Sequence, residues 1–598
     1  MGRSLLIVAL STLVLRGVCF AQFDRKIDSL ISIYNKAASD TAKVIACGKL
    51  AEYYYIYQLD RQGDSVLQQQ LKIADLSQTR NLVFATYFGN AITNINHKWA
   101  KNETIDRALQ FITKGLNYAR EQNSDDYVAL SHIRIAQINN KRGDLVAAFN
   151  HADIATIISQ NIRNDSIKIL ATLTKGEIYQ ARGESLLAFK SFTNAFENAI
   201  NINNVSLESE AYHHFSSLFF SLKNEQVAKD YLLQSLELNS KNKNGEGMIK
   251  DYIDLAKQTD ERSYIEKALQ FADSLQLESY IIESKNLMYG YYTFIIANSD
   301  STLQFLRRNP DLTQIWMNIG LPYYYMNMGE VYHYANVTDS AIYYLRLAQP
   351  GFEKDFKDRN CRDLYEAIGQ CYLLSKEPQQ AIVYYEKALA LNTQLNSLGN
   401  RASYAQVLSK LYSEAQDFKK AFYYSSMGND LKDSLQKLSN QRDIALGEVN
   451  NEKRKQEREV ELAARERITK RNLQYTAITV LITVFFFILI IMGMLPVSRI
   501  TVKLLGYFTF ISLFEFIILL LEPLLHGLTH GEPLKTWIFK IFIIALLVPL
   551  QHSLEHNLVA YLEKRKKKQI LPIKKWWVSK KKITDTTIDR IEEDTALL

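Results

Sequence analysis

Alanine recurs at one fixed spacing along most of this chain. Counting back from Ala421, alanines stand 40 residues apart at Ala381 and Ala341. A second series has the same spacing and consists of Ala108, Ala148, Ala188, Ala228 and Ala268. A fixed period of this length is typical of a stack of small repeated units, because a single globular core does not repeat its residues at one interval. We therefore expect an array of similar units.

Each unit shares a local pattern around its alanine. A small residue stands 12 positions before most of these alanines, an aromatic residue usually nine before, and a large apolar residue often four after. This spacing predicts two antiparallel helices that approach closely at the small residues, with the aromatic side chain filling the space beside them. We expect these residues to form the core between helices. The clearest examples are Gly176, Gly329 and Gly369, then Tyr179, Tyr332, Tyr372 and Tyr412, then Tyr385.

The two series are joined by an irregular interval. Ala268 and Ala341 lie 73 residues apart rather than 80. A degenerate unit fits between them, with Gly290 as the small residue, Thr302 in place of alanine, and Leu306 behind it. A further weakly marked unit is expected at about residues 28–78, so that about ten units cover residues 28–430.

Two segments carry a recognisable motif. The sequence GQCYLLSKEPQQAIVYYEKALALN, from Gly369 to Asn392, resembles a tetratricopeptide repeat, and KGEIYQARGESLLAFKSFTNAFENA, from Lys175 to Ala199, resembles it almost as well. The resemblance implies a right-handed helical solenoid whose groove binds a protein or peptide ligand. The alternative is that the motif residues only form the core, and that any binding belongs to the exposed curved surface.

Composition agrees with an all-α chain. Of 598 residues only 23 are glycine and 9 are proline, and helical periodicity is almost continuous. Residues 1–21 have the pattern of a signal peptide, so the solenoid is expected outside the cytoplasm. Cysteine is sparse and forms no CxxC pair, so we expect neither a disulfide framework nor a CxxC metal site. No cofactor is expected.

The region after the repeats predicts a membrane anchor. Residues 431–472 form a densely charged helix, which is either a solvated stalk or an interrupted coiled coil that makes a homodimer. Apolar segments follow at 473–495, 504–521 and 536–551, and three crossings would place the remaining residues, 552–598, in the cytoplasm. The protein is thus expected to be a multi-pass protein of a bacterial plasma membrane.

Positive charge is concentrated near the C-terminus. The formal net charge is +7, and ten Lys or Arg residues lie between Lys564 and Lys582 without an acid. Their position after membrane segments, together with Trp576 and Trp577, favours an anionic lipid surface over nucleic acid. We expect an interfacial helix and a lipid-binding tail, and no nucleic-acid partner.

Two ionisable residues interrupt the apolar segments. Glu515 in the second segment and Lys540 in the third are expected at similar depths below the outer surface. Because an ionised group in hydrocarbon is costly unless it is paired or hydrated, we predict an ion pair between them. The alternative is that Lys540 extends to the outer surface.

Four histidines near the C-terminus suggest a metal site. His526 and His530 have HxxxH spacing, while His552 and His556 flank the HxxEH pattern of inverted zinc peptidases. The first pair is expected at the outer face and the second near the cytoplasm, about one bilayer apart, which opposes a joint site. A membrane-embedded metal enzyme is therefore an alternative hypothesis, and our main prediction is a non-enzymatic chain without a metal.

The order of segments is similar to that of tetratricopeptide membrane signalling proteins from Bacteroidota-type bacteria, including a charged helix that begins LKDSL at Leu431. Many of those proteins continue into a histidine kinase or helix-turn-helix domain. No glycine follows Gly531 here, so glycine-rich nucleotide loops are not expected. The resemblance implies an extracytoplasmic interaction scaffold that relays binding across the membrane, or the sensor half of a split two-component system.

Overall fold

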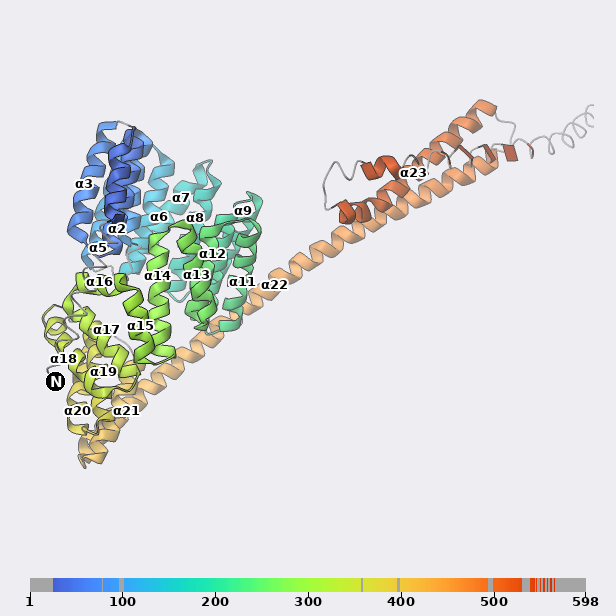
Figure 1. Cartoon of the computed structure of the whole chain (residues 1–598). Helices are drawn as coiled ribbons and strands as arrows, with labels where there is room; N and C mark the ends of the chain where they lie inside the picture. The colour runs from blue at the N-terminus through green and yellow to red at the C-terminus, as the bar shows by residue number, and fades with distance from the viewer. Residues whose placement is uncertain are drawn as a thin grey trace, which may run out of the picture. The chain divides into compact units, whose positions relative to one another are not determined.

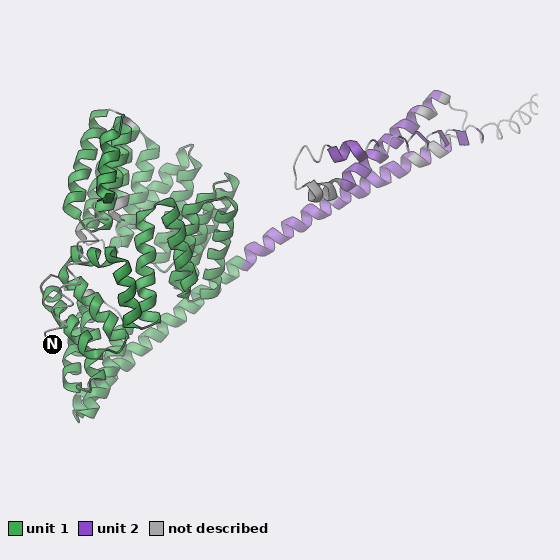
Figure 2. Ribbon diagram, in the orientation of Figure 1, with its two compact units in different colours: residues 1–453 green, residues 454–598 purple. Residues whose placement is uncertain are grey.

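Helical hairpins make up most of the molecule. The computed structural model describes residues 25–529 apart from 78, 96–101, 356–358, 395–397 and 493–497, together with isolated positions between 538 and 564. Within these ranges no β-strand occurs. The chain separates into two compact units, residues 1–453 and 454–598 (Figure 2). The predicted all-α helical solenoid is confirmed for the first unit (Figure 1).

Ten hairpins follow one another in the described part of the first unit. Residues 25–36 form an additional helix before them, and α16 (Pro310–Ile319) is inserted between the seventh and eighth. The hairpins are α2 (Asp40–Ile56) with α3 (Asp60–Ser77), α4 (Arg80–Ile95) with α5 (Asn102–Glu121), α6 (Asp125–Arg142) with α7 (Leu145–Asn161), α8 (Asp165–Ala181) with α9 (Ser185–Asn201), α10 (Val205–Ser221) with α11 (Glu225–Lys241), α12 (Gly245–Thr259) with α13 (Arg262–Leu275), α14 (Glu278–Gly290) with α15 (Ser299–Arg308), α17 (Leu321–Tyr334) with α18 (Thr338–Asp355), α19 (Arg359–Leu374) with α20 (Pro378–Gln394), and α21 (Leu398–Glu414) with α22 (Phe418–Met492).

Asparagine caps begin three successive helices in the middle of the array. The side chains of Asn204, Asn224 and Asn244 each accept a hydrogen bond from a backbone N–H three residues later, at the start of α10, α11 and α12. These caps satisfy donors that a helix start leaves without a partner. They recur every 20 residues and therefore mark where each helix of these hairpins begins.

The small residues lie where the two helices of a hairpin approach. A Cβ atom on Gly176 would lie 2.4 Å from Phe192 Cε1, and one on Gly369 would lie 3.0 Å from Tyr385 Cε2. The alanines of both series are fully buried, except Ala421, which is 8% exposed. Tyr372, Tyr385 and Tyr412 are also buried, whereas Tyr179 and Tyr332 are half-buried at the edge of their clusters.

The irregular interval before Ala341 contains a broken hairpin. Gly290 ends α14, a π-helical turn spans Tyr291–Ile295, and α15 then places Thr302 and Leu306 in the core with 0% and 4% exposure. The inserted α16 buries Trp316 to 1%. The alanine position is therefore occupied by threonine, as the sequence predicted for a degenerate unit.

The first hairpin packs against the middle of the array. Tyr53 of α2 and Tyr57, which follows the end of α2, share a core cluster with Ile282 of α14 and with Leu312 and Trp316 of α16. Figure 1 shows α2 next to α16. More than 200 residues separate these elements in the sequence. The array therefore has a long-range contact, which we call the closure, in addition to the contacts between successive hairpins.

The second helix of the last hairpin is longer than the stalk that the sequence predicted. This helix, α22, continues through the charged segment and into the first apolar segment as far as Met492. The charged segment is not exposed throughout, because Val449 is fully buried in a cluster with Phe215 and Phe219 of α10. Lys453 adds to this contact, with its Nζ 5.7 Å from the centre of the Phe219 ring.

The second unit contains α23 (Arg499–Thr529). Its Leu504–Leu521 segment is the single stretch, among the residues that the structure describes, that is long and apolar enough to cross a membrane, with a mean hydropathy of 2.3. The core helix of a soluble protein and a signal sequence can be equally long and apolar, so this segment alone is weak support for a membrane anchor. The expected signal peptide, the lipid-binding tail and half of the third apolar segment lie outside the described residues.

Candidate binding surface on the first helices

Polar side chains recur beside the small residue of each first helix. The residue directly after it is polar in seven hairpins, and a second polar residue often stands two or three positions before it. Residues three or four apart lie on one face of a helix, so these positions form a continuous strip. We call this strip the first-helix face. Its members include Gln137, Glu177, Ser217, Lys257, Glu330 and Gln370, with Arg134, His213, His214, Asp254 and Glu366 before the small residues.

Contacts between neighbouring hairpins run along this strip. The side chain of Gln137 donates to Thr174 at 3.3 Å, and that of Gln258 donates to Ser216 at 2.8 Å. His333 Nε2 lies 2.8 Å from Gln370 Oε1. Each pair spans about one repeat, so polar contacts join neighbouring hairpins at several places on or beside the strip.

His213 holds the central part of the network. Its Nδ1 lies 2.9 Å from Asp254 Oδ2, and its Nε2 lies 3.0 Å from Asp251 Oδ1. Burial opposes protonation of His213, but the two carboxylates outweigh it and raise its pKa to about 9. A protonated His213 therefore neutralises part of this acidic cluster at neutral pH. Lys257 does the same nearby, with its Nζ 2.9 Å from Glu283 Oε1.

Two other acids on the strip have a raised pKa. Burial, together with the negative charge of Asp363, raises the pKa of Glu330 to about 7. Burial likewise raises the pKa of Glu177 to about 7 against the opposing charge of Arg134. Glu330 makes no hydrogen bond or ion pair with any residue that the structure describes, whereas Glu210 interacts electrostatically with Arg134 and His214. The Glu330 carboxylate would gain from a cation brought by a ligand.

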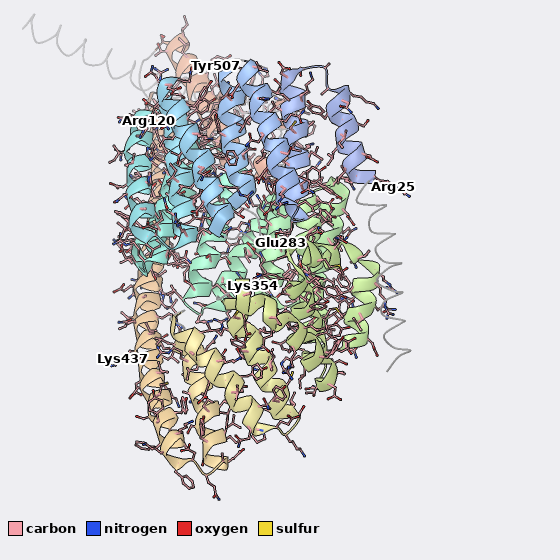
Figure 3. The ribbon with its side chains drawn as sticks, turned by 90° about the vertical axis from the view of Figure 1, so that its left-hand side faces the viewer. Arg25, Arg120, Glu283, Lys354, Lys437 and Tyr507 are labelled. Atoms are coloured by element: carbon pink, nitrogen blue, oxygen red, sulfur yellow. The ribbon has the colours of Figure 1, made fainter. Side chains whose placement is uncertain are left out.

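Acids outnumber cations on and beside the strip. Eight acids lie there, and seven of them are half-buried, so a part of each remains accessible to a ligand, while the eighth, Asp251, is fully buried against His213. The cations among the described residues there are Arg134, Lys257, Arg362, Lys410 and protonated His213. The half-buried acids are Glu177, Glu210, Asp254, Glu283, Glu330, Asp363 and Glu366. Figure 3 labels Glu283 among the helices of the first unit.

A cysteine and a histidine meet beside the strip. Cys371 Sγ lies 3.2 Å from His333 Nδ1. A similar pairing activates a catalytic cysteine, in which the histidine acts as the base. Burial raises the pKa of the Cys371 thiol to about 12. The thiol therefore stays protonated near neutral pH, and we assign this pair to the core.

The predicted ion pair and metal residues belong to the second unit. Glu515 is exposed on α23 and Lys540 is half-buried, and their pairing remains a prediction. Within the described ranges no cluster of three or more histidines, cysteines or acids could hold a metal.

Of the four histidines proposed as metal ligands, two can be placed. His552 and His556 stand at exposed helical positions. The side chain of His526 and the whole of His530 lie outside the described residues. A metal site that uses these histidines therefore remains a hypothesis.

The sequence carries a signal for the first-helix face beside the core pattern. The position directly after the small residue is Gln, Glu, Ser, Lys, Glu, Gln or Lys in seven of the first helices. In an amphipathic helix, polar residues at a fixed offset from the core position mark an exposed face. Which of these residues meet could not be predicted, since that depends on the rotation between hairpins.

Comparisons with known proteins find similar solved structures and no matching family. No family model matches the chain, and no curated protein does. The chain is similar to a signal transduction ATPase with a tetratricopeptide repeat sensor from Pyrococcus horikoshii, at 12% identity and a TM-score of 0.36, over 67% of this chain and 55% of that one. The chain thus matches little more than half of that protein's length.

Two other solved structures are covered almost completely. One is a Rap protein complexed with competence and sporulation factor, at 10% identity and a TM-score of 0.34, over 67% of this chain and 99% of that one. The other is the apo form of the quorum sensor NprR from B. thuringiensis, at 13% identity and a TM-score of 0.30, over 55% of this chain and 99% of that one. All three TM-scores are below 0.5, so these similarities are not used to assign the fold. The fold is assigned from the helices of this chain alone.

Proposed function

We propose that this chain is a membrane-anchored, extracytoplasmic scaffold whose first-helix face binds a protein or peptide segment rich in lysine or arginine. The observation that carries the proposal is the strip of half-buried acids on successive first helices, in which Glu330 makes no hydrogen bond or ion pair with any described residue. A cationic segment laid along the strip would meet carboxylates once per repeat. Charge-assisted hydrogen bonds to such groups are among the stronger polar contacts in proteins.

Membrane attachment is the second part of the proposal. It is supported by the apolar Leu504–Leu521 segment of α23, and by the signal-like sequence and basic tail at the two ends of the chain. We place the solenoid outside the cytoplasm and the tail on the anionic inner surface. Alkaline extraction of cell membranes tests this, because a spanning chain stays in the pellet while a peripheral one is released.

Binding is tested with the purified full chain in detergent and two fluorescent dodecapeptides of equal length, one lysine-rich and one glutamate-rich. We expect the lysine-rich peptide to bind more tightly, and its affinity to fall as salt is raised. Glu366→Gln should weaken it about tenfold, because the amide keeps the hydrogen bond from Tyr404 but removes the charge. Glu237→Gln, on the exposed side of α11, is the matched control. Equal binding of both peptides would contradict the proposal.

A relay of binding toward the membrane is a second candidate function. It is favoured by α22, which contacts α10 through Val449 and continues without a break to Met492. If the first-helix face and this contact are coupled, bound peptide should change amide hydrogen exchange at residues 445–453. Unchanged exchange there, with peptide bound, would leave the protein as a scaffold without relay.

A further inference from the structure

A cavity lies where the first hairpin closes against the middle of the array. It has a volume of about 720 Å³ and is lined from both sides of the closure. This is within the range of sites for small molecules, about 300–1,000 Å³. One wall comes from residues 25–29 and the end of α2, and the other from α13 to α16. The cavity is separate from the first-helix face, since it shares none of its residues.

Specific contacts hold the two walls together. Tyr57 Oη donates to Glu278 Oε1 at 3.0 Å, and Asn318 Nδ2 donates to the backbone oxygen of Tyr57 at 2.7 Å. Lys26 Nζ is 3.4 Å from Gln276 Oε1 at the rim. Beneath the walls, Trp316 packs in the same cluster as Tyr57. A site with walls fixed in this way is largely formed before a ligand arrives.

Charges of both signs line the cavity. Lys285 and Asp311 neutralise one another, with their side chains 2.5 Å apart. Arg25 and Arg308 make no hydrogen bond or ion pair with any described residue. Figure 3 labels Arg25 at the end of the first helices, next to the following helices of the array. Two guanidinium groups without partners are suited to a carboxylate, which arginine binds through two parallel hydrogen bonds.

Acids in the same walls select against a ligand that is only anionic. Glu278 and Asp273 face the cavity together with the arginines. They would repel a phosphate or a dicarboxylate, whereas an ammonium group beside them would be attracted. The amide side chains of Gln276, Gln314 and Asn318 can exchange hydrogen bonds with peptide groups. The lining thus matches a molecule with one carboxylate, one ammonium group and amides between them.

We propose that this cavity binds a short zwitterionic peptide of a few residues, with its free carboxylate toward Arg25 and Arg308 and its free ammonium group toward Glu278 and Asp273. Because the two walls belong to the first hairpin and to the middle of the array, the bound peptide bridges the closure. It therefore stabilises the contact between α2 and α14.

Calorimetric titration of the purified full chain with tetraalanine tests the proposal. The two comparison probes are N-acetyl-tetraalanine, which lacks the ammonium group, and tetraalanine amide, which lacks the carboxylate. We expect tetraalanine to bind one to one, and each blocked peptide to bind at least about tenfold more weakly, since each loses a charged hydrogen-bonding group. Absence of tetraalanine binding at millimolar concentration would overturn the proposal, as would equal binding of all three.

Variants identify the site. Arg308→Gln should weaken tetraalanine binding by about tenfold or more and leave the affinity for tetraalanine amide unchanged. Arg307→Gln is the matched control, because it removes the same charge from the adjacent residue, which does not line the cavity. Glu278→Gln can still accept from Tyr57, and it should remove the preference for tetraalanine over its N-acetyl form. Equal effects of the two arginine variants would contradict the assignment.

Hydrogen exchange provides the second measurement. With tetraalanine bound, amides of α2 and α14 should exchange more slowly, while α8 and α19 remain unchanged. Protection confined to α8 and α19 would place the peptide on the first-helix face and overturn the cavity assignment. Since Glu366→Gln lies outside the cavity, it should leave tetraalanine binding unchanged, which separates a failure of this proposal from a failure of the first-helix face.

Discussion

At the scale of single residues, the array depends on glycines that face large side chains. Gly329 on α17 opposes Leu345 on α18, and a Cβ atom added to Gly329 would lie 2.6 Å from Leu345 Cγ and 3.2 Å from its backbone nitrogen. A flexible side chain can move away from such a contact, whereas the backbone of a buried helix cannot. The close approach of two helices therefore depends on the missing side chain.

We expect Gly329→Ala to lower the free energy of unfolding. Overpacking of this kind costs about 1–3 kcal/mol, which exceeds the gain of about 1 kcal/mol that alanine brings to a helix. Gly447→Ala is the control, because nothing lies within 4 Å of the Cβ position at Gly447 on α22. Thermal unfolding should show a lower midpoint for the first variant and an equal or higher one for the second. Two equal midpoints would mean that the helices can separate at no cost.

The acid next to this glycine should make stability depend on pH. Burial and the charge of Asp363 raise the pKa of Glu330 to about 7 in the folded chain, above the value of about 4.3 for an exposed glutamate. Folded chains therefore bind more protons than unfolded ones between these values. The stability contributed by protonated Glu330 is fully present below pH 4.3 and is lost as the pH rises through 7.

Glu330→Gln removes that loss, so the variant should gain stability relative to the natural chain as the pH is raised from 5 to 8. Unfolding midpoints of both proteins across this range provide the measurement. Glu237→Gln, at an exposed position of α11, is expected to follow the natural chain at every pH. Parallel curves for Glu330→Gln and the natural chain would show that Glu330 is ionised in the folded state throughout.

At the scale of elements, α22 differs from every other second helix because it extends beyond its own hairpin. Val449 is fully buried against α10, Glu452 Oε1 lies 3.8 Å from Lys190 Nζ, and Lys453 Nζ lies 5.1 Å from the centre of the Tyr231 ring. Figure 3 labels Lys437 on an earlier turn of the same helix, and this residue is exposed. One short segment of α22 thus carries the contact.

Val449→Asp should detach this segment from α10. The change removes about 1.5–3 kcal/mol of apolar burial and would place an unpaired charge in the cluster, so undocking is the lower-energy outcome. Hydrogen exchange should accelerate at residues 445–453 and at the end of α10, while the other hairpins keep their protection. Ile444→Asp is the matched control, since Ile444 is 64% exposed. Unchanged exchange in Val449→Asp would mean that the cluster does not hold the helix.

The hairpins could be predicted from sequence because their contacts are local. Ala188 and Gly176 meet residues within about one repeat, so a fixed spacing records each contact directly. Val449 could not be distinguished in this way from Val460, which is 70% exposed on the same charged helix. Its burial depends on rotations that accumulate over several hairpins and leave no spacing in the sequence. The closure between Tyr57 and Trp316 escaped prediction for the same reason.

At the scale of the whole molecule, a stack of repeats is stabilised chiefly by neighbours, and its ends are therefore weak. Here two long-range contacts supplement the stack, one from α2 to α14 and α16 and one from α22 to α10. The contact from α22 to α10 extends the first unit beyond the last repeat. The sequence indicated a solenoid that stops at residue 430, whereas the first compact unit extends to Lys453.

Two truncated chains distinguish these boundaries. Residues 25–453 keep every core cluster described for the first unit, whereas residues 25–430 lose Val449 and uncover Phe215, Phe219 and Tyr231. We expect the longer chain to be monomeric, with the higher unfolding midpoint. The shorter one should unfold at a lower temperature and bind a hydrophobic dye, because an aromatic cluster without its cover is exposed apolar surface. A third chain, residues 25–453 with Val449→Asp, should behave like the shorter one despite its length. If all three unfold at one temperature, α22 contributes nothing beyond its own hairpin and the first unit ends where the repeats do.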